Sequence, residues 1–217
     1  MGKPQFGYWD LRGLGHATRF ALAYMGVDYE HVVYIENNEE AGGEKTWAHQ
    51  KPKLGMDAPN LPYWFDDKVK LTESLAILKY VVRKYKPALM PTDLVQLSKV
   101  EQTEGVIADT YSYIFAAAYS GTDKEKERFE SETPKKVEIL SKCLGDKKFL
   151  LGNEMCYLDF VLFEQFSMLT KYRPDLVPKN LQAFVSNLEK IPEIATYISS
   201  PTFISSPFFG RTSLAQV

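Results

Sequence analysis

Four short segments of the chain carry side chains or backbone groups that could bind or activate a ligand. The first, residues 8–14, begins with Tyr8 and falls between an expected strand and an expected helix, where α/β sheets usually bind ligands. In the second, residues 58–62, the proline that opens a strand could form a cis peptide bond and turn the preceding backbone groups toward a bound peptide. Ordinary turn chemistry explains the second segment as well, and neither segment alone indicates a function.

The other two segments could bind carboxylates. Ser74 lies near the start of an expected helix, where a hydroxyl and free backbone N–H groups can bind a carboxylate beside the positive helix end. Plain helix capping explains this serine equally well. Trp47 and Lys51 are four residues apart and would share one helical face, so an indole N–H and an ammonium could bind a second carboxylate. Packing of a surface lysine on a tryptophan is the commoner reason for such a pair.

Short strands and helices alternate in the first part of the chain and could hold these segments together. Strand-like runs occur at four places, residues 5–7, 31–35, 61–65 and 68–71, of which the second has the composition of a buried strand. Apolar residues from 17 to 25 have the spacing of a one-sided helix, and another helix is expected over about 73–84. The polar stretch 36–44 is expected to be an exposed loop. We therefore predict the order β-α-β-α-β-β-α for a first domain, residues 1–84.

The rest of the chain has helical periodicity and no strand alternation. Pro87 and Pro91 cannot continue a helix, because each lacks a backbone donor and restricts the residue before it, so we place a linker at residues 85–91. Two apolar stripes with helical spacing follow, one from Ile107 to Ala118 and one from Leu181 to Leu188. We predict an all-helical second domain over residues 92–217.

Composition excludes several classes of function. With 26 Lys and Arg against 28 Asp and Glu, the chain lacks the basic surface that nucleic acid or an anionic membrane requires. No apolar stretch approaches the roughly 18 to 20 residues of a membrane span, and the first residues do not resemble a signal peptide. Two cysteines are too few for a disulfide framework, and the three histidines have no metal-ligand spacing. We expect a soluble cytoplasmic protein without a metal.

In their order and separations, the four segments resemble the mu class of cytosolic glutathione S-transferases. The resemblance extends over nearly the full chain and is carried by residues 7–14, 47 with 51, 53–57, 59–63 and 71–78. It implies an α+β protein with a thioredoxin-like N-terminal domain and an all-α C-terminal domain, assembled as a homodimer. It also implies conjugation of glutathione, a co-substrate rather than a prosthetic group, to small hydrophobic electrophiles. The loop before Trp47 resembles the insertion typical of the mu class.

The resemblance implies roles for individual residues. Tyr8 matches the catalytic tyrosine. The positions that match glutathione contacts are Tyr8, Trp9, Leu14, Trp47, Lys51, Asn60, Leu61, Glu73, Ser74 and, reaching across from the partner subunit, Asp109. The electrophile site is expected to contain Leu11, Phe115, Tyr119 and Phe209. Tyr119 matches a second tyrosine that hydrogen-bonds to developing charge on epoxides or activated carbonyls. A solvated acidic side chain is the alternative for Asp109, and a packed aromatic is the alternative for Tyr119.

The chemistry of glutathione fits these side chains. Its two carboxylates, its ammonium and its thiol find partners in Ser74, in Lys51 with Trp47, in Glu73 and in Tyr8. A thiol of pKa about 8.5 is only a few per cent ionised at pH 7, yet the thiolate is the nucleophile. Tyrosine, with a pKa of about 10, is a poor base near neutrality but a good hydrogen-bond donor to sulfur. We therefore expect Tyr8 to donate a hydrogen bond to the thiolate rather than to remove the thiol proton.

Three positions and one segment depart from the family pattern. Ala58 stands where a phenylalanine usually anchors the dimer, and Cys156 replaces the serine or threonine of a helix-cap motif. Glu73 replaces a glutamine, and residues 207–210 diverge, so the electrophile is not identified. An inactive relative that carries hydrophobic ligands, or an isomerase that uses glutathione as a cofactor, is an alternative on the same fold.

Overall fold

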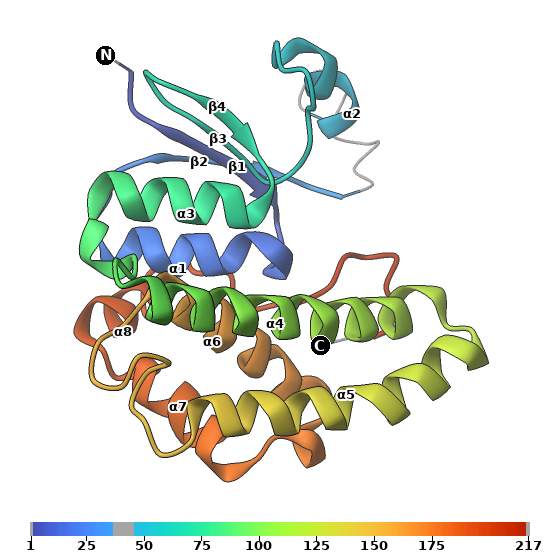
Figure 1. Ribbon diagram of the computed structural model, residues 1–217. Coiled ribbons are helices and arrows are strands. Elements are labelled where there is room, and N and C mark those ends of the chain that lie inside the picture. The colour runs from blue at the N-terminus through green and yellow to red at the C-terminus, as the bar shows by residue number, and fades with distance from the viewer. Residues whose placement is uncertain (1, 37–45, 216–217) are drawn as a thin grey trace.

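The computed structural model describes residues 2–36 and 46–215 of the chain. A sheet with two covering helices stacks on a larger bundle of helices (Figure 1). Apart from Glu36, the loop expected at residues 36–44 lies outside the described residues. Within the described part of the chain, no helix combines the length and the apolar character needed to cross a membrane.

The sheet has four strands in the order β2-β1-β3-β4. Their bounds are β1 (Gln5–Trp9), β2 (Glu30–Tyr34), β3 (Tyr63–Phe65) and β4 (Lys70–Thr72). β1 is parallel to β2 and antiparallel to β3, which pairs antiparallel with β4. With α1 (His16–Tyr24), α2 (Trp47–Gln50) and α3 (Ser74–Tyr85), the element order is the predicted one.

Two details of the predicted strands are wrong. β1 extends through Tyr8 and Trp9, which we expected after the strand; aromatic residues favour strands, and the chain leaves the sheet only at Asp10. The run 31–35 is not a buried strand, because β2 lies at the edge of the sheet and buries only Tyr34. Tyr8 is therefore fixed by strand pairing, which holds its side chain more firmly than a loop would.

Helices α1 and α3 lie between the sheet and the helical bundle (Figure 1). Each has one face in the core under the sheet, through Leu22 and Ile77, and another in the core of the bundle, through Phe20 and Leu78. All four side chains are almost completely buried. Because the same two helices fill both cores, the sheet and the bundle pack against each other through a shared layer.

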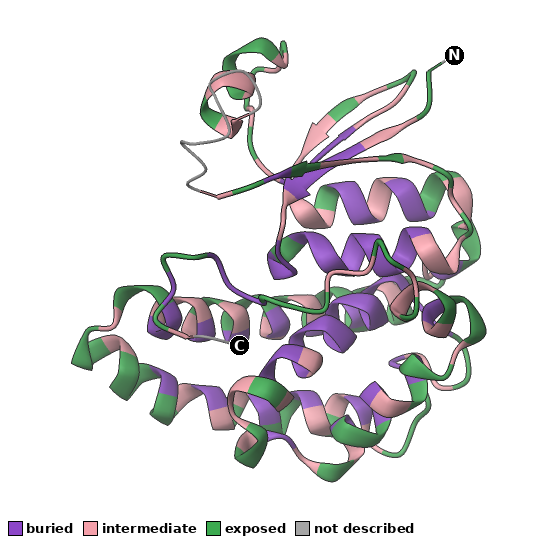
Figure 2. Cartoon of the chain, turned by 180° about the vertical axis from the view of Figure 1, so that it is seen from behind, coloured by how far each residue is buried: buried purple, intermediate pink, exposed green. Residues whose placement is uncertain are grey.

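The bundle consists of α4 (Leu94–Ser120), α5 (Asp123–Leu144), α6 (Tyr157–Tyr172), α7 (Lys179–Glu189) and α8 (Pro192–Ile198). The prediction of an all-helical second half is thus confirmed. α6 is mostly apolar, and most of its residues are buried (Figure 2), as expected for a helix surrounded by others. A short 3-10 turn, Pro87–Leu89, separates α3 from α4 within the segment where we place the linker.

Candidate functional site

Tyr8 lies next to the last residue of β1, with its side chain packed against the 3-10 turn Gly13–Gly15. The side chain is 6% exposed, and its hydroxyl oxygen accepts a hydrogen bond from the N–H of Leu14 at 3.0 Å. The two glycines make this packing possible. A Cβ at Gly13 would lie 2.6 Å from the Tyr8 hydroxyl, and one at Gly15 would lie 2.4 Å from Cδ1 of the ring. Any larger residue at either position would displace the tyrosine.

Burial raises the pKa of Tyr8 to about 12, and the hydrogen bond from Leu14 and the charge of Arg19 offset only part of this effect. The phenol therefore keeps its proton at neutral pH. Since its oxygen already accepts from the backbone, the proton remains available to a second acceptor. This geometry suits donation of a hydrogen bond to an anion and does not suit removal of a proton.

Arg19 holds the backbone that follows Tyr8. Its buried guanidinium donates to the carbonyls of Leu11 at 2.6 Å and Trp9 at 2.8 Å, and to Nε2 of His31 at 3.1 Å. Burial, and then the charge of Arg19, lowers the pKa of His31 to about 4, so His31 stays neutral and can accept. Our sequence reasoning missed Arg19. The signal was available, because Arg19 is the only Asp, Glu, Lys or Arg residue in α1, and an isolated charge in an apolar helix indicates a buried, paired side chain.

Arg12 ties the same loop to the bundle and to the C-terminal segment. Its Nε and one terminal nitrogen donate to the two carboxylate oxygens of Glu164 on α6 at 2.9 and 2.5 Å, and both side chains are buried. The Arg12 guanidinium lies 4.2 Å from the ring centre of Phe208. The N–H groups of Arg12 and Gly13 donate to the carbonyls of Pro207 and Phe208. The loop that covers Tyr8 is thus fixed from both halves of the molecule.

The predicted pair Trp47 and Lys51 lies close to Trp9. The Trp47 ring packs edge-on at 6.4 Å from the ring of Trp9 and at 5.4 Å from that of Tyr34. The ammonium of Lys51 lies 6.0 Å from the centre of the Trp47 ring. The two side chains therefore share one face, as predicted, and the lysine also packs on the tryptophan, as the commoner alternative expects.

A second group of predicted residues meets at the start of α3. The Leu61–Pro62 peptide bond is cis, which the sequence had indicated as a possibility. The side-chain amide of Asn60 lies 3.5 Å from a carboxylate oxygen of Glu73. Glu73 has a φ of 71°, a left-handed conformation that is uncommon for residues other than glycine and tends to occur at functional sites. No side chain caps α3, so helix capping does not account for Ser74, and the first N–H groups of the helix stay open.

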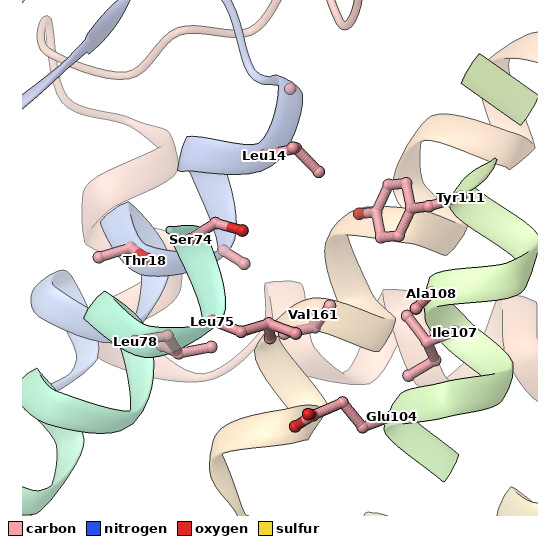
Figure 3. A pocket seen from close by; sticks show the side chains of 12 residues that line it. Leu14, Thr18, Ser74, Leu75, Leu78, Glu104, Ile107, Ala108, Tyr111 and Val161 are labelled. Carbon is pink, nitrogen blue, oxygen red and sulfur yellow. The ribbon is translucent and has the colours of Figure 1, made fainter. Parts of the chain in front are cut away.

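A cavity of about 210 Å³ lies between the turn at Gly13–Gly15, α3, α4 and α6 (Figure 3). Leu14 and Ser74, two of the predicted glutathione contacts, line it together with Tyr111 of α4. Leu14 is also the residue whose N–H binds the Tyr8 hydroxyl. The cavity therefore connects the environment of Tyr8 with the open end of α3.

Three of the four residues predicted for an electrophile site come together near the C-terminal end of α4. The rings of Phe115 and Tyr119 stack at 6.0 Å with an angle of 5°, and Phe209 packs edge-on against both. The Tyr119 hydroxyl accepts a hydrogen bond from the N–H of Gly210 at 2.6 Å. Tyr119 is among the groups that influence the pKa of Tyr8, so two tyrosines far apart in sequence lie in one region of the structure. Leu11 and Phe209 are buried.

Comparison with known proteins agrees with this arrangement. Residues 4–83 match the model of the glutathione S-transferase N-terminal domain, and residues 108–201 match a model of the C-terminal domain. A glutathione S-transferase of Tyrophagus putrescentiae is 38% identical over 213 residues, which cover 94% of each chain. The chain belongs to the glutathione S-transferase family.

Family members of the mu class are among its relatives. Glutathione S-transferase Mu 1 of Bos taurus is 34% identical over 212 residues, or 96% of each chain. The crystal structure of the glutathione S-transferase Blo t 8 has a TM-score of 0.77 and 26% identity, and covers 98% of this chain and 100% of that one. A Pi-class enzyme of Onchocerca volvulus, 19% identical with a TM-score of 0.81 over 98% of this chain and 100% of that one, shares the fold. The family and the fold that the motifs implied are therefore confirmed.

Of the ten residues that the family resemblance assigned to glutathione, only Leu14 and Ser74 line the cavity. Asp109 is exposed on α4, and its carboxylate pairs with Lys136 of α5 at 2.6 Å. It does not line the cavity, although its neighbour Ala108 does. Within the described residues, no cluster of three or more His, Cys, Asp or Glu side chains could hold a metal ion.

Proposed function

We propose that this family member conjugates glutathione to small hydrophobic electrophiles, with Tyr8 as the hydrogen-bond donor that stabilises the thiolate. The observation that carries the proposal is the state of the Tyr8 hydroxyl. It is buried, it remains protonated because its pKa is raised to about 12, and its oxygen already accepts from Leu14. Lowering the thiol pKa by about two units requires roughly 2.7 kcal/mol, which is within the range of a hydrogen bond to a charged group.

We assign the glutathione site to the residues around the cavity and α2. Ser74 and the open N-terminus of α3 bind one carboxylate, because they present a hydroxyl and backbone N–H donors beside the positive helix end. Glu73, held next to Ser74 in a left-handed conformation, receives the ammonium. Lys51 and Trp47 bind the second carboxylate beside Trp9. Leu14, Asn60 and Leu61 complete the contacts with the peptide.

The electrophile site in this proposal lies along α4, between Tyr8 and Tyr119. The thiolate sulfur attacks an electrophilic carbon, and the electron pair of the broken bond leaves with a halide or stays on an oxygen. Tyr119 hydrogen-bonds to that oxygen as its negative charge develops. Phe115 contributes an apolar wall, against which the buried Phe209 packs edge-on. Leu11, in the loop after Tyr8, belongs to the site as the family resemblance implies. Holding the two reactants together supplies the rest of the rate enhancement.

We also propose a cytoplasmic homodimer. In that assembly Asp109 of the partner subunit would approach the ammonium of glutathione, in agreement with its exposure on α4 and its absence from the lining of the cavity in its own chain. Because two-fold symmetry relates the two subunits, the dimer would have two separate and equivalent sites.

One assay separates this function from its alternatives. The protein is passed over immobilised glutathione, and the retained fraction is tested for turnover of an activated aryl halide. Retention with glutathione-dependent turnover is the expected result. Retention without turnover indicates a carrier of hydrophobic ligands, and product formation without consumption of glutathione indicates an isomerase. Absence of both retention and turnover contradicts the proposal.

A further inference from the structure

Tyr111 stands on the wall of the cavity opposite Ser74. It comes from α4, whereas Ser74 begins α3, and the two hydroxyl oxygens point toward each other across the cavity (Figure 3). Tyr111 also packs against Phe115 with ring centres 5.6 Å apart, and Phe115 stacks on Tyr119. One face of α4 therefore carries a row of three aromatic rings that leads from the proposed electrophile site to Ser74.

The Tyr111 hydroxyl has no hydrogen-bond partner among the residues that the structure describes. Burial raises the pKa of this phenol well above its usual value, so it is a neutral donor with a free proton. Partly buried tyrosines normally place their hydroxyl against a hydrogen-bonding group. A bound molecule that fills the cavity is the natural source of that group.

The polar groups around the cavity indicate which chemical group would bind there. Ser74 offers a hydroxyl, and the N-terminus of α3 offers N–H groups that no side chain caps. Glu104 also lines the cavity, but its carboxylate is bound by the ammonium of Lys79 at 2.8 and 2.9 Å and by the hydroxyl of Tyr157 at 2.7 Å. Donors that converge from two walls favour a ligand with two acceptor oxygens, and a carboxylate has this chemistry.

We propose that Tyr111 is a glutathione-binding residue whose phenol donates a hydrogen bond to the α-carboxylate of the γ-glutamyl group, opposite Ser74. The inference rests on the proposed function, in which Ser74 and Glu73 bind the amino-acid end of glutathione. The N-terminus of α3 then binds one oxygen of the α-carboxylate, and Tyr111 of α4 binds the other. Tyr111 acts on binding and leaves the ionisation of the thiol to Tyr8.

Substitution of Tyr111 by phenylalanine removes only the hydroxyl and keeps the aromatic packing. Titration calorimetry with S-hexyl glutathione, whose thioether excludes any effect of thiol ionisation, measures Kd for the wild type and Tyr111→Phe. We expect Kd to rise about tenfold, which corresponds to about 1.4 kcal/mol. The matched control is Tyr113→Phe on the same helix, where the ring packs against Arg128 at 4.7 Å and does not line the cavity. Its Kd should equal that of the wild type.

Two analogues identify the group that Tyr111 binds. The S-hexyl tripeptide with a 4-aminobutyryl group in place of γ-glutamyl lacks the α-carboxylate, and the one with a glutaryl group keeps it but lacks the ammonium. Tyr111→Phe should weaken the glutaryl analogue about tenfold and leave the affinity for the 4-aminobutyryl analogue unchanged. Equal losses for both analogues, or no loss for S-hexyl glutathione, would overturn the inference while the proposed function stands. A wild type that binds none of the three ligands contradicts the proposed function itself.

Discussion

Tyr8 and Tyr119 share one hydrogen-bonding pattern. Each phenol oxygen accepts from a backbone N–H, that of Leu14 for Tyr8 and that of Gly210 for Tyr119, and burial raises the pKa of both. The backbone thus fixes each oxygen in place and leaves each proton free for a ligand. Two donors can then serve two acceptors, the sulfur of glutathione and an oxygen of the electrophile.

Substitution of Tyr119 by phenylalanine should affect only some substrates. Its hydroxyl matters where an oxygen gains negative charge in the transition state, so epoxide opening and addition to an enone should slow by about tenfold or more. Aryl halides have no such oxygen, and their conjugation should be unchanged. Comparison of kcat/KM for both substrate types in wild type and Tyr119→Phe measures this. Equal slowing of both types, or of neither, would make Tyr119 a packing residue.

The residues with local signals could be predicted from the sequence, and those with distant partners could not. Ser74 and Trp47 with Lys51 were identified by position and spacing within a few residues. Arg12 was recognised only as part of a motif, because its partner Glu164 is 152 positions away. Only the fold shows that the charge of Arg12 is buried and paired. For Tyr111, the apolar spacing of the helix predicts a core residue, and only the fold shows that its hydroxyl faces a cavity.

Among the elements, the start of α6 depends on a buried carboxylate. Asp159 accepts the N–H of Cys156 at 2.8 Å and that of Leu150 at 2.9 Å, and it is fully buried. The sequence predicted Cys156 at the cap position, which the structure confirms, with a thiol that is completely buried. Burial raises the pKa of Asp159 to about 6 despite these hydrogen bonds. The fold therefore tolerates the neutral form of Asp159 better than the charged form.

This shift predicts how stability depends on pH. In the unfolded chain Asp159 loses its proton near its ordinary pKa of 3.8, whereas in the folded protein it does so near 6. Below about pH 4, the neutral form of Asp159 contributes about 2 to 3 kcal/mol to the free energy of unfolding. This contribution is lost as the pH rises to about 6. Urea denaturation of wild type and Asp159→Asn at several pH values tests this. The wild type should lose stability relative to the variant over that interval, and a constant difference would contradict the shift.

At the level of elements, the periodicity of the sequence located the helices and strands but not their edges. Apolar spacing predicted the stripes of α4 and α7 because each of these helices buries one face. It also predicted α1, although α1 packs into both cores and is buried on more than one face. β1 was predicted too short, since the aromatic pair Tyr8 and Trp9 belongs to a motif that also continues into a loop. β2 is exposed because it lies at the edge of the sheet. The order of the strands decides this position, so the five residues of β2 could not reveal it.

For the molecule as a whole, the proposed homodimer lacks an aromatic anchor at position 58. The segment that would insert into the partner carries Ala58, which is exposed and whose carbonyl accepts a hydrogen bond from Thr72 at 3.0 Å. An alanine cannot fill a pocket that an aromatic side chain fills. Single anchoring side chains of this kind often contribute about 2 kcal/mol or more to an interface.

Substitution of Ala58 by phenylalanine should therefore strengthen the dimer. We expect the dissociation constant to fall by about tenfold or more, equivalent to at least about 1.4 kcal/mol. Sedimentation of wild type and Ala58→Phe over a dilution series measures it. A variant that dissociates at the same or a higher concentration than the wild type would show that the interface has no pocket for an aromatic ring at this position.

The stabilisation of the glutathione thiolate by Tyr8 is the central claim, and the pKa of the bound thiol tests it directly. Ultraviolet titration of the thiolate in the complex should give a pKa about two units below the free value of about 8.5 in the wild type. In Tyr8→Phe the pKa should return to within about half a unit of the free value, while calorimetry shows that glutathione still binds, since its carboxylate contacts remain. A thiol pKa in Tyr8→Phe equal to that of the wild type, with glutathione bound, would contradict the claim.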